Sequence, residues 1–273
     1  MTKLTGNLID IGVNLTGKLF KKDLPQVIER AISSGVSQMV VTGTNLKHSE
    51  EATDLCAKWP ENLLCTAGVH PHHAKEWHAK SAQQFQKLAE NIAVRAIGEC
   101  GLDYNRNFST PRDQRYAFEA QLELAAELGL PVFLHQRDAH KDFLQIMGRW
   151  RDRLPGGVVH CFTGTSDEAK ASLDMDLHIG ITGWLCDERR GRSLQQAVET
   201  IPLEHLMIET DAPYLLPRDL PEKVSAQLQL RRNEPMVLSH VCAALAKYKN
   251  VDVQEVAVQT TQLARQFFAI NLE

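Results

Sequence analysis

The chain has 273 residues, 43% of them hydrophobic and 23% charged, so it has enough apolar material for a large buried core. Its formal net charge of −4 excludes the broadly basic surface of a protein that coats duplex nucleic acid. No secretory signal pattern opens the chain, no apolar run approaches a membrane span, and the six cysteines form no CxxC pair. We therefore expect a cytoplasmic protein with reduced cysteines.

Short apolar segments alternate along the chain with stretches that have helical spacing of apolar residues. Eight of the apolar segments are predicted strands: 8–14, 38–43, 63–70, 94–103, 131–138, 157–164, 177–184 and 206–212. Eight strand–helix repeats favour a parallel sheet closed into a barrel. An open doubly wound sheet is the alternative, but no GxGxxG motif follows the first strand. We predict one α/β domain over residues 1–273, a single (β/α)8 TIM barrel.

Helices are predicted between the strands and after the last one. The residues 23–34 and 111–128 carry apolar stripes, and the second stretch is entered through Thr110 and Pro111 and stopped by Gly129. After a long polar loop over 213–234, the stretches 236–247 and 253–269 are predicted terminal helices that cover the barrel.

Ionisable side chains follow the predicted strands where each strand ends. These residues are His70, His72, Glu99, Asp103, His135, Arg137, His160, Glu209 and Asp211. The carboxyl ends of the strands of a parallel barrel open onto one face, which is where such barrels carry their chemistry. The pattern therefore predicts one functional site at this face.

Four of these residues predict a divalent metal site: Glu99, His135, His160 and Asp211. Carboxylate oxygen and neutral imidazole suit magnesium, manganese or zinc, and an incomplete protein shell leaves room for water and substrate. Of the Glu209 and Asp211 pair, one side chain can bind the metal while the other orients its neighbours. We favour Asp211 as the ligand because it lies nearer the rim.

Each of these signals also has a purely structural interpretation. A single histidine that ends a strand is more often a hydrogen-bonded core residue, and only the convergence of several at one face favours a site. His140 and His178 are interpreted as structural. Trp184 fits both rim packing and a platform for base stacking, and the sequence does not choose between them.

The strand ends also resemble a known family. The stretches that match in order are 10–15, 42–45, 67–72, 96–103, 131–138, 159–164, 208–215 and 232–235, and together they span nearly the whole chain. They are similar to the TatD family of metal-dependent nucleases, within the wider amidohydrolase-like barrels. The linking segments 105–109 and 184–191 match as well, and their closeness favours the bacterial branch of the family.

The resemblance implies a hydrolase of phosphodiester bonds, a magnesium-stimulated 3′–5′ exonuclease on single-stranded DNA and RNA ends, with a part in DNA repair or degradation. It implies Glu99, His135, His160 and Asp211 as metal ligands, with Mg²⁺ as the functional ion and Zn²⁺ or Mn²⁺ as alternatives. Proton transfer falls to Glu209, Asp211, His70 or Asp103. The implied substrate contacts are His72, Arg137, Arg218, Arg232 and Asn233. No membrane and no obligate protein partner are expected.

The sequence departs from the family pattern at the first strand. Many relatives carry His-x-His there, whereas this chain has Gly12 and Asn14. Glycine has no ligating side chain and asparagine is a weak neutral ligand, so we expect fewer or weaker metals than in those relatives.

Two other functions remain open at the level of sequence. Similar barrels also hydrolyse amide and ester bonds, as deacylases do, so the same ligands fit that chemistry. The loss of His-x-His also fits a weakly catalytic protein that binds nucleic acid.

Overall fold

The computed structural model describes residues 7–228 and 232–270. All eight predicted strands form, and they pair side by side in chain order, each parallel to the next. Their bounds are β1 Leu8–Val13, β2 Val36–Val41, β3 Leu63–Ala67, β4 Val94–Asp103, β5 Val132–Arg137, β6 Gly157–Val159, β7 His178–Ile181 and β8 Leu206–Ile208. The predicted parallel arrangement is therefore confirmed.

The sheet closes where the ends of β1 and β8 meet. An isolated parallel bridge joins Val13 to Ala212, the Asn14 amide donates to the Ala212 carbonyl at 2.8 Å, and the Asp211 amide donates to the Gly12 carbonyl at 2.9 Å. These bonds make the sheet a barrel and bring Asn14 and Asp211 together, although 197 positions separate them in the chain.

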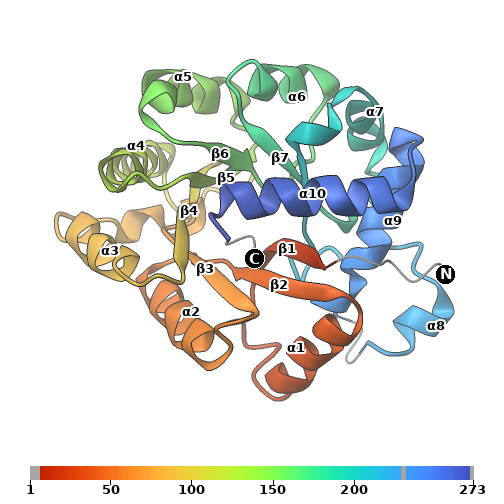
Figure 1. The fold of residues 1–273 in the computed structure, drawn as a ribbon. Helices are drawn as coiled ribbons and strands as arrows, with labels where there is room; N and C mark the ends of the chain where they lie inside the picture. The colour runs from red at the N-terminus through yellow and green to blue at the C-terminus, as the bar shows by residue number, and fades with distance from the viewer. Residues whose placement is uncertain (1–6, 229–231, 271–273) are drawn as a thin grey trace.

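Helices surround the barrel, and they lie between and after the strands (Figure 1). They are α1 Leu24–Ser33, α2 Leu46–Lys58, α3 Ser81–Ala89, α4 Pro111–Leu128, α5 His140–Trp150, α6 Ser166–Leu173, α7 Arg192–Thr200, α8 Glu222–Ser225, α9 Leu238–Lys249 and α10 Val253–Phe267. Short 3-10 helices are η1 Pro71–Glu76, η2 Arg151–Arg153, η3 Gly183–Cys186, η4 Leu203–His205 and η6 Pro235–Val237. None of the helices in these described ranges has the length and apolarity to cross a bilayer.

Helix α4 shows how local sequence sets an element's ends. The Thr110 side chain accepts a hydrogen bond from the Asp113 amide, which satisfies one of the unpaired donors of the first turn. The helix ends at Gly129, whose φ of 64° lies in the left-handed region that glycine adopts without steric cost. The predicted bounds of this helix are confirmed at both ends.

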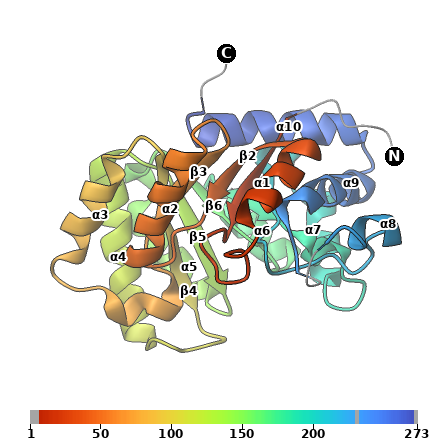
Figure 2. The same cartoon turned by 90° about the horizontal axis from the view of Figure 1, so that it is seen from below.

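The two terminal helices have different places. Apolar side chains inside the barrel, among them Ile9, Phe133 and Met207, form one cluster with Ala264, Phe268 and Ile270 of the C-terminal segment. Helix α10 therefore closes the end of the barrel where the strands begin, as Figure 2 shows. Helix α9 packs beside α7, α10 and η3 in the outer layer.

The last strands are shorter than the sequence predicts. Strand β6 stops at Val159 and β8 at Ile208, because the chain turns at Cys161 and Asp211, whose φ angles are 48° and 53°. His160, Glu209 and Asp211 therefore lie just past their strands, where extended alternation no longer sets side-chain direction. The predicted loop over 213–234 also contains the short helix α8.

Candidate active site at the mouth of the barrel

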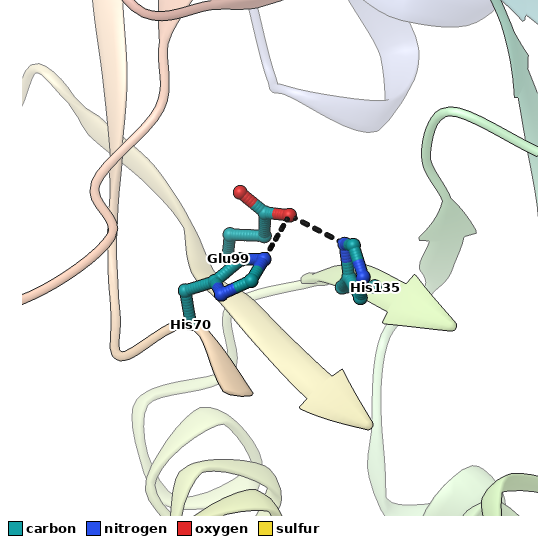
Figure 3. A group of neighbouring side chains, drawn as sticks. All are labelled: His70, Glu99 and His135. Atoms are coloured by element: carbon teal, nitrogen blue, oxygen red, sulfur yellow. Dashed lines mark hydrogen bonds and ion pairs between the residues drawn. The ribbon is translucent and has the colours of Figure 1, made fainter. Parts of the chain in front are cut away.

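The centre of the site is one carboxylate oxygen of Glu99. Oε1 lies 2.8 Å from Nδ1 of His135 and 2.7 Å from Nε2 of His160, and both contacts are hydrogen bonds. Nε2 of His70, at the end of β3, lies 3.4 Å from the same oxygen. Figure 3 shows His70 and His135 on either side of Glu99. Three imidazoles from three strand ends thus converge on one buried carboxylate.

Glu209 lies behind His160 and sets its orientation. Its side chain is fully buried, accepts a hydrogen bond from the Cys161 amide, and places Oε2 3.3 Å from Nδ1 of His160. A carboxylate on one imidazole nitrogen fixes the tautomer and leaves the other nitrogen for a ligand. The Phe133 ring stacks on His160 at 4.5 Å and holds the ring plane.

Two glycines make room for the Glu209 carboxylate. A Cβ atom added at Gly12 would overlap Oε2 of Glu209, and one added at Gly180 would overlap Oε1. Glycine at position 12 therefore has a packing role, because the Glu209 carboxylate occupies the space that a side chain at this position would fill.

Asp103 and His72 form the outer side of the site. Oδ2 of Asp103 lies 2.8 Å from Nε2 of His72 and 3.5 Å from Nε2 of His135. Its other oxygen accepts from the Arg106 amide at 2.9 Å. Asp103 thus ties His72 at the rim to His135 deeper in the site, and the Phe108 ring meets His72 edge-on at 4.8 Å.

The segment around Asp211 is held by contacts with the first strand that sequence reasoning did not find. Asn14 donates to Oδ1 of Asp211 at 2.9 Å. Asp10, fully buried in β1, accepts from both the amide and the hydroxyl of Thr210 and from the Gly12 amide. A charged residue inside an otherwise apolar strand is the sequence signal that identifies Asp10.

Burial and mutual charge shift the pKa values of these groups. Burial acts to raise the pKa of Glu99, but the charge of His160 and the hydrogen bonds from His135 and His160 outweigh it and hold that pKa well below its usual range. Burial opposes charge on His160, yet Glu99 and Glu209 raise its pKa well above the ordinary value. Burial lowers the pKa of His70 to about 3. For Asp211, burial raises the pKa to about 7, against the charge of His160.

The residues at this mouth fit a divalent cation. His70, Glu99 and His135 place ligand atoms within 4.8 Å of one another, and the buried Nε2 of His135 has no neighbour closer than Oδ2 of Asp103 at 3.5 Å, which is too long for a good hydrogen bond. Buried polar nitrogens normally have a partner, so this atom indicates room for a ligand. Imidazole nitrogen and carboxylate oxygen are donors that zinc, manganese and, through the carboxylates, magnesium accept. The geometry adds His70 to the histidines that sequence reasoning assigned to the metal.

Two of the predicted substrate residues lie at the open rim. Arg137 is exposed at the end of β5 and lines a cavity of about 310 Å³ with Asn105, Phe162, Thr163 and Ser193 among others. Arg218 is 55% exposed and its Nε lies 3.1 Å from Oδ2 of Asp187.

Arg232 and Asn233, which were also predicted to contact substrate, are engaged inside the protein. Arg232 is buried, with ion pairs to Asp23 at 2.5 Å and Glu234 at 3.2 Å, and its guanidinium lies over the Phe20 ring. The Asn233 amide donates to the carbonyls of Thr210 and Tyr214. These contacts fasten the segment after residue 231 to the barrel, so both side chains hold the loop that begins at Asp211.

Trp184 and Arg190 form another rim contact. The Arg190 guanidinium lies 4.3 Å from the centre of the Trp184 ring. This stacking gives the tryptophan a packing role and leaves base stacking as a prediction.

Comparisons with known proteins identify the family of the chain. A family profile described as TatD related DNase matches residues 9–269. The chain is 51% identical over 266 residues to a curated protein of Citrobacter rodentium named 3′-5′ ssDNA/RNA exonuclease TatD, covering 97% of this chain and 99% of that one. A protein of the same name from Salmonella typhimurium is 49% identical over 263 residues, which is 96% of this chain and 99% of that one.

Solved structures give the same result for the fold. A TatD family hydrolase from Entamoeba histolytica superposes with a TM-score of 0.88 at 29% identity, over 96% of this chain and 98% of that one. YJJV, a TatD homologue from Escherichia coli, superposes with a TM-score of 0.87 at 25% identity, over 97% and 99%. With the profile match and the sequence identity, these likenesses show that the chain belongs to the TatD-related DNase family.

Proposed function

We propose that this chain is a metal-dependent 3′–5′ exonuclease that hydrolyses phosphodiester bonds at the ends of single-stranded DNA and RNA. The observation that carries the proposal is the gathering of three histidines on the buried Oε1 of Glu99, with Asp103, Glu209 and Asp211 around them. So many carboxylates would repel a phosphodiester unless a cation stood among them. The names of the Citrobacter and Salmonella relatives support the polarity and the substrates.

Glu99, His135, His160 and Asp211 are the proposed ligands, with His70 beside them. A divalent ion held there would polarise a phosphoryl oxygen and lower the pKa of a water molecule. We propose Mg²⁺ as the physiological ion because the family resemblance implies it, with Mn²⁺ or Zn²⁺ as substitutes. Glu209 holds His160, and Asp103 holds His72 and faces His135.

We assign the proton of the attacking water to Asp211. Its Oδ1 accepts the bond from Asn14, which leaves Oδ2 for the proton. In the protein without a cation, burial raises the pKa of Asp211 to about 7; a carboxylate beside a metal-bound water is a group that can accept the proton of that water. The water oxygen bonds to phosphorus as one phosphorus–oxygen ester bond of the terminal linkage breaks, the leaving alkoxide takes up a proton, and the 3′-terminal nucleotide departs.

Arg137, His72 and Arg218 are the proposed substrate contacts. Arg137 and Arg218 are exposed at the rim, where a guanidinium can pair with backbone phosphates. His72 lies between the rim and Asp103, within reach of the terminal nucleotide.

The test compares purified, metal-stripped protein on matched labelled strands. Mg²⁺, Mn²⁺ or Zn²⁺ is added in turn to single-stranded DNA, duplex DNA and RNA. A 5′ label should yield a stepwise ladder, whereas a 3′ label should leave at once in a mononucleotide. The Asp211→Ala variant should lose turnover while keeping its circular dichroism spectrum. Asp174→Ala removes a carboxylate from an exposed ion pair with Lys170 and should be unaffected.

Other outcomes point to other functions. Immediate release of a 5′ label, or full activity in the Asp211→Ala variant, would sink the proposal. Metal-dependent cleavage of an amide or ester panel, with intact oligonucleotides, would favour the deacylase-like function. Binding that ignores chelator, with no cleavage, would favour a binding protein.

We also propose action in the cytoplasm without an obligate protein partner. All six cysteines are free, and five of them are buried, which suits a reducing compartment. A part in DNA repair stays a prediction of the family resemblance.

A further inference from the structure

A second group of metal-binding side chains lies outside the mouth of the barrel. Cys186 at the end of η3, Asp219 in the loop after β8 and His240 in the first turn of α9 place one ligand atom each within 4.8 Å of one another. Oδ1 of Asp219 lies 2.7 Å from Nε2 of His240. Three segments that are far apart in the sequence thus bring thiol, carboxyl and imidazole to one point.

One side of this group is buried in the protein and the other side is accessible to solvent. Cys186 is buried at 5% exposure and the His240 side chain is 17% exposed, whereas the Asp219 side chain is 50% exposed and gives an ion an entry path. Next to it, Asp187 pairs with Arg218, the neighbours of Cys186 and Asp219. Two successive residue pairs therefore join the η3 segment to the loop after β8.

The donor types indicate which ion the group prefers. Thiolate and imidazole favour zinc over magnesium, and the two negative charges of Cys186 and Asp219 would balance one divalent ion. Burial first and then the facing Asp219 carboxylate raise the pKa of the Cys186 thiol, while the Lys247 amine opposes the shift. Without a cation the thiol therefore keeps its proton, and metal binding releases that proton to solvent.

We propose that Cys186, Asp219 and His240 bind one Zn²⁺ ion at a site separate from the mouth of the barrel. The three protein ligands leave a fourth position for water, and the ion fastens η3 and the loop after β8 to helix α9. Through Arg218, which neighbours Asp219, this site steadies a residue that we assign to substrate contact. The proposal does not depend on the nuclease function, because it concerns the ligands alone.

The test uses Co²⁺ as a spectroscopic substitute for Zn²⁺ on the full chain in excess Mg²⁺. A thiolate ligand gives a sulfur-to-cobalt charge-transfer band in the near ultraviolet, which imidazole and carboxylate ligands do not give. We expect one such cobalt per chain, displaced by added Zn²⁺. Cys186→Ser should lose the band, and Cys161→Ser, which alters a cysteine at the mouth, should keep it.

A second variant guards against misfolding. Asp219→Ala removes a half-exposed side chain, so it should fold as the parent does by circular dichroism. Loss of one ligand should weaken Zn²⁺ binding by about a hundredfold or more, measured by competition with a chromogenic chelator. Absence of the band in the parent chain, its persistence in Cys186→Ser, or its loss in Cys161→Ser would overturn the proposal.

Discussion

The two ends of the barrel use histidine in opposite ways. At the mouth, His70, His135 and His160 surround Glu99. At the closed end, His178 and His205 face each other at 5.3 Å, with the Phe267 ring of α10 edge-on to His178 at 5.8 Å.

Carboxylates make the difference between the ends. The pKa of His160 is raised by Glu99 and Glu209 despite burial, whereas burial and the neighbouring His205 lower the pKa of His178 to about 4. His160 contacts two buried carboxylates, whereas His178 lies beside another imidazole and a phenyl ring. At the mouth, His70 also stays neutral because burial lowers its pKa to about 3 despite Glu99, so the number of contacting carboxylates decides whether a buried histidine is charged.

The largest expected effect comes from Glu99, where the imidazoles of the mouth meet. Glu99→Gln removes the charge that holds His135 and His160 and a proposed metal ligand. Loss of several kcal/mol of transition-state stabilisation corresponds to a fall in kcat/KM of roughly a thousandfold. Steady-state kinetics on a 5′-labelled oligonucleotide measure it. A loss below about tenfold would contradict the central place of Glu99.

Substitution of Asp103 should lower kcat/KM less than Glu99→Gln does, because Asp103 orients neighbouring side chains and is not a proposed metal ligand. Its Oδ2 holds His72 and faces His135 without belonging to the proposed ligands. Asp103→Asn should lower kcat/KM by roughly ten- to a hundredfold, as changes to groups that orient metal ligands do. The same assay measures it, with the metal concentration varied to detect weaker metal binding. A loss equal to that of Glu99→Gln would make Asp103 a direct ligand.

Gly12 tests the packing of the mouth through stability. In Gly12→Ala the added Cβ overlaps the Glu209 carboxylate and lies 3.2 Å from the Phe133 ring. Overpacking of this kind costs about 1–3 kcal/mol in the free energy of unfolding, measured with urea.

The matched control is Gly148→Ala in α5, where the nearest atom to the new Cβ is Met175 Cε at 3.8 Å. Alanine in an exposed helix should be neutral or stabilising by about 0.5–1 kcal/mol. Equal destabilisation of both variants would show that Glu209 is not held against Gly12.

The smallest effect concerns acid stability at the closed end. The folded protein keeps His178 neutral until its pKa of about 4, whereas the unfolded chain binds a proton near 6.5. Stability from the neutral ring is complete above 6.5 and falls as the pH drops toward 4. His178→Gln should therefore lose less stability between about pH 7 and about pH 5 than the parent, by urea midpoints. An identical acid dependence would refute the buried, neutral state.

Much of this arrangement could be predicted from the sequence, because strand ends in a parallel barrel meet at one face. That rule locates Glu99, His135 and Asp103 by counting along β4 and β5. The same rule does not predict the Asn14–Asp211 contact or the position of Glu209 between Gly12 and Gly180. These features depend on barrel closure and on the turns with positive φ at Cys161 and Asp211.

Arg232 has intramolecular partners that the sequence does not reveal. A basic residue in a loop beyond the last strand suggests a phosphate contact, yet here it bonds Asp23 and Glu234. The sequence does not reveal that α1 and its entry loop pack against that segment, so the intramolecular partners could not be predicted. The grouping of Cys186, Asp219 and His240 could not be predicted either. The three residues lie on separate segments, and the strand pattern does not determine how those segments pack against one another.

The central claim is that the mouth of the barrel holds a catalytic divalent ion on Glu99 and its histidines. Anomalous diffraction from crystals of the active protein soaked in Mn²⁺ tests it most directly. We predict a peak in coordination distance of Glu99, His135 and His160, which disappears in Glu99→Gln crystals. Metal-dependent cleavage in solution, with no peak at the mouth in the parent crystals, would contradict the account.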